Sequence, residues 1–288
     1  AACGSTASTT SASESAAATP AAETAAPATA ETSAKTPKYI FLFIGDGMSY
    51  PQIQSTNYYL SALQNGTSMG GDGAILQHED ALTFLDFPVV GSAQTYDSTS
   101  FCPDSASTAT SLSTGHKTYS GTINMDETGT VAYETISEKL KDQKGYKIGV
   151  VSSVNINHAT PAAFYCHQAS RSNYYDIGLE MIDSNFDYFA GGALLEPTGA
   201  DEDQPDLYTL AAEAGYTVAK TQAEAEAITA DTGKAILIDE HLADGDAMAY
   251  ELDRTDDMWS LADYVDKGIE VLDNDTGFFM MVEGGKID

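Results

Sequence analysis

The chain has 288 residues and a formal net charge of −30, from 43 acidic and 13 basic side chains. It is long enough to bury a sizeable core, and its negative charge disfavours nucleic acid and other polyanions as partners. The longest apolar run, residues 39–44, is far shorter than the roughly 18 residues that a membrane-spanning helix requires. Composition therefore predicts a soluble, acidic main body.

The first 36 residues differ in composition from the rest. Residues 1–3, Ala-Ala-Cys, resemble the end of a bacterial lipobox, which predicts a lipid on Cys3; a chance cysteine is the alternative. Nearly every residue of 4–36 is Ala, Ser, Thr, Pro or Glu, and such a segment buries too little apolar surface to fold. We therefore expect a disordered tether that joins residues 37–288 to the outer face of a bacterial membrane, with a secreted protein as the alternative.

From residue 39 onward, strand patterns alternate with helix patterns. Continuous apolar runs rich in aromatic and β-branched residues are typical of strands buried on both faces. They predict strands at 39–44, 89–96, 147–152, 187–190, 235–238 and 278–282. Helix patterns lie at 51–63, 133–142, 207–214, 222–228 and 258–272, and a further helix opens at Ser105. This alternation predicts an α/β fold, with a three-layer α/β/α sandwich around a mostly parallel central sheet.

Polar residues follow four of the predicted strands. Asp46 lies between two glycines after the first strand, and Ser105 follows the second. Residues 157–161 follow the third strand, and residues 282–288 follow the last. Each alone is an ordinary turn, helix start or N-cap. Together they predict a site beyond the carboxyl ends of the strands, where open α/β sheets bind ligands.

These clusters carry a resemblance to the alkaline phosphatases. The matching stretches, in the order of that family, are Phe-Ile-Gly-Asp-Gly-Met at 43–48, Pro-Asp-Ser-Ala-Ser-Thr-Ala-Thr at 103–110, His-Ala-Thr-Pro-Ala at 158–162 followed by Arg171, and Val-Glu-Gly-Gly-Lys-Ile-Asp at 282–288. Agreement of several motifs is far more specific than a single match. The resemblance covers residues 37–288 and implies hydrolysis of phosphomonoesters through a phosphoserine, with two Zn²⁺ and one Mg²⁺ per complete site. It also leaves a homodimer open.

The resemblance implies a role for each matching residue. Ser105 would attack phosphorus, Arg171 would hold the phosphate oxygens, and Asp104 would orient Arg171. The implied metal ligands are Asp46, shared by zinc and magnesium, Ser105 on zinc, Thr160 and Glu283 on magnesium, and Asp288 on the other zinc.

Two further expectations concern the segment after residue 157. His158 stands where some members of the family have aspartate and others histidine, so we place it beside the magnesium site and leave the metal preference there open. Thr160 and Arg171 are eleven residues apart, which is about 16 Å along an unbroken helix. The helix that starts near Pro161 must therefore end or turn before Arg171.

The remaining histidines and cysteines match no ligand position. We interpret the histidines as structural or surface residues: His78, His116, His167 and His241. Cys102 and Cys166 are expected to be buried thiols, and whether they pair depends on their separation in space.

The remaining zinc ligands of the family lie beyond the position that matches Asp288. We therefore expect these 288 residues to be the N-terminal part of an enzyme, with an incomplete fold and little or no phosphatase activity alone. Zinc sites generally need three or four protein ligands.

Alternatives to a phosphomonoesterase stay open. A phosphodiesterase or related metallohydrolase of the same superfamily could share the sheet and the metals. A surface lipoprotein could bind phosphate without catalysis, in which case Ser105→Ala would leave its function unchanged. A sulfatase is disfavoured, because Pro103 directly follows Cys102 and Ala106 stands where the Cys-x-Pro-x-Arg pattern requires arginine.

Overall fold

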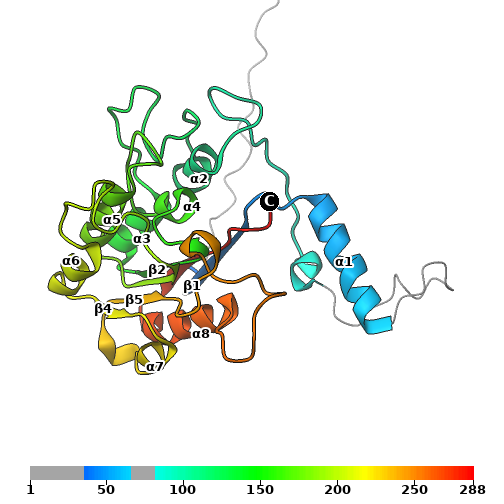
Figure 1. Cartoon of the computed structure of the whole chain (residues 1–288). Coiled ribbons are helices and arrows are strands. Elements are labelled where there is room, and N and C mark those ends of the chain that lie inside the picture. The colour runs from blue at the N-terminus through cyan, green and yellow to red at the C-terminus, as the bar shows by residue number, and fades with distance from the viewer. Residues whose placement is uncertain (1–35, 66–81) are drawn as a thin grey trace, which may run out of the picture. The chain divides into compact units, whose positions relative to one another are not determined.

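The computed structural model of the protein describes residues 36–65 and 82–288 (Figure 1). Cys3, nearly all of the expected tether and His78 lie outside these residues. Residues Pro37–Asp288 form one compact unit. Within the described ranges, no helix combines the length and the apolar character needed to cross a bilayer.

A six-stranded parallel sheet organises this unit. Its spatial order is β1-β6-β2-β3-β5-β4, and every neighbouring pair is parallel. The strands are β1 (Tyr39–Gly45), β2 (Lys147–Asn155), β3 (Tyr188–Gly192), β4 (Thr217–Ala219), β5 (Ala235–Ile238) and β6 (Phe278–Gly284). The last strand lies between the first two, so the carboxyl ends of β1, β6 and β2 are adjacent.

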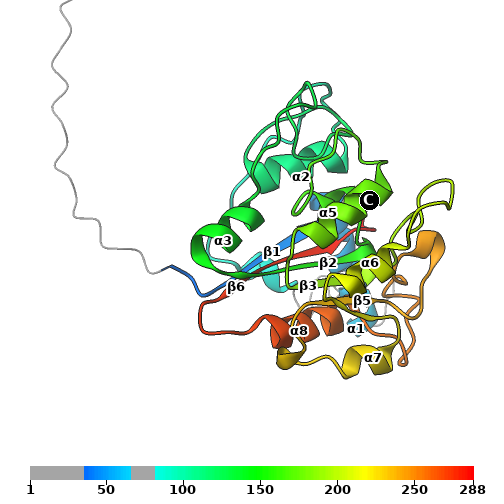
Figure 2. The ribbon, with the colours of Figure 1, turned by 90° about the vertical axis from the view of Figure 1, so that its left-hand side faces the viewer.

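Helices connect the strands and cover both faces of the sheet (Figure 2). The α-helices are α1 (Tyr50–Asn65), α2 (Ser105–Thr114), α3 (Ile136–Lys144), α4 (Ala159–Ala162), α5 (Tyr174–Asp183), α6 (Leu207–Glu213), α7 (Gln222–Glu226) and α8 (Leu261–Leu272). The described residues also form short 3₁₀ turns at η2 (Thr83–Asp86), η3 (Ala230–Thr232) and η4 (Asp244–Asp246). Parallel strands require such crossovers, because each strand must return to the same starting edge.

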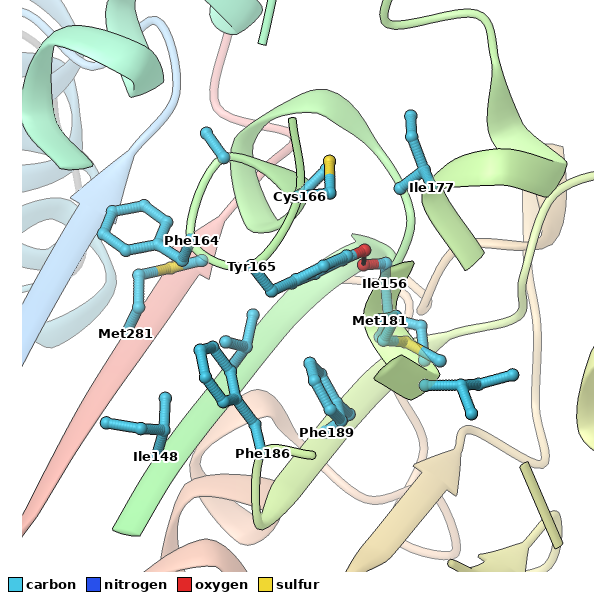
Figure 3. Close-up of a cluster of buried hydrophobic side chains, with 14 of the residues drawn as sticks. Ile148, Ile156, Phe164, Tyr165, Cys166, Ile177, Met181, Phe186, Phe189 and Met281 are labelled. Carbon is cyan, nitrogen blue, oxygen red and sulfur yellow. Dashed lines mark hydrogen bonds between the residues drawn. The ribbon is translucent and has the colours of Figure 1, made fainter. Parts of the chain in front are cut away.

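The side chains of β6 alternate between two cores, as the two-residue period of a strand dictates. Phe279 and Met281 join one cluster with residues of α2, α4, α5 and α6, part of which Figure 3 shows. Phe278 and Met280 join a second cluster with residues of α7 and α8 on the opposite face. The three-layer α/β/α architecture predicted from the alternation of elements is therefore confirmed.

One predicted strand, 89–96, is wrong. That stretch is irregular, and its two valines, Val89 and Val90, are 82% and 85% exposed. Its apolar and β-branched composition has strand propensity, but a strand needs a hydrogen-bonding neighbour, and none is paired with it among the described residues. Ser105 thus follows an irregular segment and not a strand.

Other element boundaries differ modestly from the sequence prediction. The helix expected at 133–142 begins at Ile136, because Thr135 and Glu138 form a capping box that fixes the start. The short edge strand β4 and the helix α5 were not predicted. Three residues give β4 too little pattern to detect, whereas α5 has a clear apolar face formed by Ile177, Met181 and Ile182.

Candidate active site

The carboxyl ends of β1, β2 and β6 meet the start of α2 at one cavity of about 860 Å³. Its lining includes seven of the eight residues that the sequence singled out: Asp46, Asp104, Ser105, His158, Thr160, Arg171 and Asp288. The eighth, Glu283, is fully buried on β6, in register with Ile44 of β1, which is one of the lining residues. The fold thus gathers all the predicted site residues at one edge of the sheet.

Ser105 is the first residue of α2, and its side chain faces Asp46. The Ser105 hydroxyl donates to Asp46 Oδ2 at 2.7 Å, across 59 residues of sequence. Ala106 and Ala109 are buried in the core, so their small side chains let α2 pack closely against the layer beneath it. The free N–H groups and the positive dipole at this end of α2 favour an anion next to the hydroxyl.

Asp104 connects that helix to Arg171. One carboxylate oxygen, Oδ1, caps α2 by accepting from the Ser107 backbone N–H at 3.1 Å. The other, Oδ2, accepts from Arg171 Nη1 at 3.0 Å. Burial alone would raise the pKa of Asp104, but the hydrogen bonds from Gly121, Ser107 and Arg171 outweigh burial and lower it. Asp104 therefore stays ionised and holds Arg171 beside Ser105.

The chain turns back between Thr160 and Arg171, as the spacing argument requires. The helix α4 has only four residues and ends at Ala162, and the Arg171 backbone N–H donates to the Gly121 carbonyl at 2.7 Å. This turn, which helix geometry predicts from the sequence, brings Arg171 back to the cavity and is confirmed.

His158 lies beside Arg171 in the lining of the cavity. Its Nε2 is 3.2 Å from Arg171 Nη2, and its Nδ1 is buried without a hydrogen-bond partner among the described residues. Burial, together with the charge of Arg171, lowers the pKa of His158, although Asp46 and Asp288 oppose this. The imidazole is therefore neutral, and Nε2 accepts from the guanidinium.

Glu283 is the most perturbed carboxyl group in the site. Ser152 Oγ donates to Oε2 at 2.5 Å, whereas Oε1 is buried with no partner in the part of the chain that the structure describes. The pKa of Glu283 is raised to about 7: burial is the largest cause and the charges of Asp46 and Asp288 add to it, while hydrogen bonding to Ser152 and Thr160 counteracts only part of the rise. A buried carboxylate with one free oxygen indicates a site for a cation.

Gly47 allows Asp288 to approach Asp46. The φ of Gly47 is +69°, and a Cβ there would lie 2.1 Å from the Cβ of Asp288. The Asp46 backbone N–H also donates to the Gly284 carbonyl at 3.0 Å. The loop after β1 and the loop after β6 therefore fit together only with glycine at position 47.

The donors around this cavity fit magnesium well and zinc in part. Asp46, Thr160 and Glu283 offer only oxygen atoms, which magnesium prefers, and the orphaned Oε1 of Glu283 is available. Zinc also takes carboxylate oxygens, but its sites generally use three or more protein ligands that include nitrogen or sulfur. Within the described ranges, no three His, Cys, Asp or Glu side chains are grouped closely enough to hold a metal ion.

A family model described as alkaline phosphatase matches residues 37–188 and 193–288. The chain belongs to the alkaline phosphatase family. Alkaline phosphatase 4 of Bacillus subtilis (strain 168) is 31% identical over 258 residues, which cover 86% of this chain and 51% of that protein. The resemblance inferred from the four sequence motifs is therefore confirmed.

Solved alkaline phosphatases have the same fold. The enzyme from the Antarctic bacterium TAB5 has a TM-score of 0.68 and 30% identity, covering 86% of this chain and 65% of that one. A histidine-to-aspartate variant of the TAB5 alkaline phosphatase, described with Mg bound, has a TM-score of 0.67 and 30% identity, covering 86% and 64%. The chain spans about half the length of the curated alkaline phosphatases that it matches.

Two supports of this alkaline phosphatase site were not predicted from the sequence. Ser152 binds Glu283 from the neighbouring strand β2. Asp97 is 5% exposed and accepts hydrogen bonds from Ser100 N–H and Ser107 Oγ at 2.6 and 2.9 Å. The run of Ser and Thr after Asp97 signals an Asx-type turn, but nothing local indicates that the turn lies against α2.

Among the described residues, the cysteines and the remaining histidines lie outside the cavity. Cys102 is exposed, so the expectation of a buried thiol there is wrong: it lies in the irregular segment before α2, not in the core. Cys166 is buried as expected, and both are free thiols. His116 is exposed, and His167 and His241 are half-buried outside the cavity.

Proposed function

We propose that the protein is a metal-dependent phosphomonoesterase in which Ser105 becomes phosphorylated. The observation that carries this proposal is the contact between Ser105 Oγ and Asp46 Oδ2 at the start of α2, in the cavity that Arg171 also lines. A serine hydroxyl is a weak nucleophile at neutral pH and needs a base or a metal ion beside it. Membership of the alkaline phosphatase family supports the same assignment.

In this proposal, Arg171 and the N-terminus of α2 bind the phosphate group. The guanidinium has one edge on Asp104 and His158, which fixes its plane and leaves its remaining N–H groups for phosphate oxygens. The unpaired N–H groups of the first turn of α2 offer further donors. These groups compensate locally for the net charge of −30, which otherwise repels an anionic substrate.

Two displacements at phosphorus follow from this arrangement. Ser105 Oγ forms a bond to phosphorus as the bond to the alcohol oxygen breaks, the serine proton is lost, and the alcohol takes up a proton. Water then attacks the phosphoserine, the bond between phosphorus and Oγ breaks, and Ser105 is regenerated with release of inorganic phosphate. In the first step Asp46 orients Oγ by accepting the hydrogen bond of the Ser105 hydroxyl at 2.7 Å.

Metal ions complete the proposed site. Asp46, Thr160 and Glu283 would hold magnesium, and Asp46, Ser105 and Asp288 would contribute to two zinc ions. Bound zinc supplies stabilisation of the serine alkoxide and of the leaving oxygen. The solved TAB5 variant is described with Mg bound, which supports the magnesium part of this proposal.

The activity is proposed for the full-length natural protein, because the curated relatives are about twice as long as this chain. We propose that residues 1–288 alone have little or no activity. The two forms should be compared for turnover and zinc content together, and full activity of residues 1–288 alone would contradict this part of the proposal.

The proposed reaction is tested by substrate choice. The full-length protein, loaded with zinc and magnesium, is assayed with an aryl phosphate monoester, the matching diester and the matching sulfate. We expect a kcat/KM for the monoester at least about 100-fold above the other two. A diester has one fewer free oxygen for Arg171 and α2 to bind, and a sulfate ester carries one negative charge fewer than the monoester dianion. Faster diester hydrolysis would favour a phosphodiesterase, and phosphate binding without turnover would favour a non-catalytic binding protein.

A further inference from the structure

His167 lies outside the cavity, between two helices on one face of the sheet. Its Nε2 is 3.5 Å from Glu138 Oε2 on α3, and its Nδ1 is 3.6 Å from Glu180 Oε2 on α5. Nε2 is also 3.1 Å from the Tyr133 carbonyl oxygen. One imidazole thus connects the segment before α3 with both helices, which Figure 2 shows on the same side of the sheet.

The surroundings of His167 favour its charged form. Burial lowers the pKa of His167, but Glu138 and Glu180 outweigh burial and raise it to about 10. The other titratable groups beside these carboxylates are Tyr165 and Cys166, and burial raises the pKa of both well above their usual values, so they stay neutral. The imidazolium is therefore the positive charge that balances two carboxylates from different helices.

The same residue begins the short segment that carries Arg171. The His167 backbone N–H donates to Glu180 Oε2 at 2.7 Å. Gln168 exchanges backbone hydrogen bonds with Ile123 at 2.8 and 2.9 Å, and its side-chain amide donates to Glu180 Oε1. Three residues later the Arg171 N–H donates to the Gly121 carbonyl at 2.7 Å. Glu180 thus fixes the start of the segment, and the loop around Gly121 fixes its end.

We propose that His167, paired with Glu138 and Glu180, is a positioning residue for Arg171. It sets the path of residues 167–171, so that the guanidinium reaches Asp104 and His158 from the correct side. A side chain that must meet a phosphate within a fraction of an ångström depends on the position of its own backbone. This inference rests on the proposed role of Arg171 in holding phosphate.

Substitution of His167 in the full-length, metal-loaded protein tests the proposal. His167→Gln removes the charge that joins α3 to α5, and we expect the KM and the inhibition constant of inorganic phosphate to rise about 3- to 10-fold, with kcat changed by less than about 2-fold. In an Arg171→Ala background the same substitution should have no further effect on either constant, because the group it positions is absent. His241→Gln, at another half-buried histidine, is the matched control and should change neither constant.

A second variant and a second measurement keep the test decisive. Glu138→Gln removes one of the paired charges but keeps the oxygen that completes the Thr135 capping box, so it should fold and shift the phosphate constants in the same direction by a smaller factor. Hydrogen exchange of the Arg171 backbone N–H should be faster in both variants than in the parent.

The outcomes distinguish the positioning role from the proposed function. The positioning role would be overturned if His167→Gln raised the KM and the phosphate inhibition constant equally with and without Arg171. Unchanged hydrogen exchange at the Arg171 N–H would also overturn it. A parent protein that hydrolyses no phosphomonoester would overturn the proposed function, whereas hydrogen exchange would still report whether His167 orders the segment.

Discussion

The two sides of the cavity differ in how their charges are balanced. On the phosphate side, formed by Asp104, Ser105 and Arg171, the carboxylate and the guanidinium are paired and the hydroxyl has an acceptor. On the cation side, formed by Asp46, Glu283 and Asp288, three carboxyl groups influence one another, and no Lys or Arg forms an ion pair with them among the described residues.

This difference shows what each side needs for function. The phosphate side is organised by hydrogen bonds within the chain. The cation side carries a buried carboxylate whose pKa is raised to about 7, which is unfavourable until a positive charge binds. Variants on the cation side should therefore change the response of the protein to metal removal more than variants on the phosphate side do.

The largest effect is expected at Ser105. Ser105→Ala should lower kcat for a phosphomonoester at least about 10³-fold, because it removes the proposed nucleophile. Binding of inorganic phosphate should remain, since Arg171 and the N-terminus of α2 are intact. Ser111→Ala, in the same helix, is the control and should retain activity; turnover by Ser105→Ala close to that of the parent would contradict the proposed chemistry.

The next effect is expected at Arg171. Arg171→Ala should weaken inorganic phosphate as an inhibitor and lower kcat/KM by about 10²-fold, because Asp104 loses its partner and the phosphate loses its fork of donors. Arg171→Lys should recover only part of this loss, since an ammonium cannot contact Asp104 and two phosphate oxygens in one plane. The inhibition constant of inorganic phosphate, measured for both variants, tests this prediction. Full recovery of phosphate binding in Arg171→Lys would contradict it and show that only the positive charge is needed.

A smaller effect of opposite sign is expected at Glu283. The raised pKa means that ionised Glu283 destabilises the folded, metal-free protein as pH rises from about 4.5 to about 7, on the order of 3 kcal/mol when complete. Glu283→Gln should therefore stabilise the metal-free protein by about 2 kcal/mol at pH 8, with the difference shrinking towards pH 4.5.

Urea unfolding at several pH values, with and without magnesium, measures this prediction. Magnesium should stabilise the parent more than the variant, because the variant loses a carboxylate ligand. A less stable metal-free variant at pH 8 would mean that Glu283 is well accommodated without a cation, and the contrast between the two sides would fail.

The smallest effect is expected at Asp97, which supports the phosphate side. Burial would raise its pKa, but hydrogen bonds from Ser120, Thr99 and Ser107 outweigh burial and hold the pKa well below its usual range. Asp97→Asn should cost about 1 to 2 kcal/mol at pH 7, because an amide cannot accept all of these bonds. The contribution of Asp97 is present above the ordinary aspartate pKa of about 4 and is lost as pH falls below it. The gap between parent and variant in urea unfolding should accordingly narrow below pH 4, and a gap independent of pH would contradict this.

Much of the fold could be predicted because buried parallel strands carry a strong local signal. The apolar runs in β2, β5 and β6 contribute to both cores, because helices cover both faces of the sheet there. In β1 the alternate side chains Tyr39, Phe41 and Phe43 are exposed, so only one face of that strand packs against a core. The stretch 89–96 also has apolar and β-branched residues, but no strand in the described part of the chain pairs with it, and the sequence does not encode that distinction locally. Strand prediction from the sequence is therefore limited more by the unknown pairing partner of a segment than by the β-propensity of its residues.

The residues of the site could be predicted from the sequence, but the contacts that hold them in place could not. The four motifs of the family gave the residues that line the cavity, and helix geometry gave the turn before Arg171. The contacts of Ser152 with Glu283 and of Asp97 with Ser107 join residues through the folded structure, so no spacing rule reveals them. The same holds for His167, whose two partners come from α3 and α5.

The central claim is that the hydroxyl of Ser105 carries the phosphoryl group during turnover. The full-length, zinc- and magnesium-loaded protein is mixed with a phosphomonoester, quenched in acid during the steady state, digested and analysed by mass spectrometry. The account predicts one phosphoryl group on the peptide that contains Ser105, and none in the Ser105→Ala variant. Rapid turnover with no phosphoryl group on Ser105 at any quench time or pH, or with the group on another residue, would contradict it.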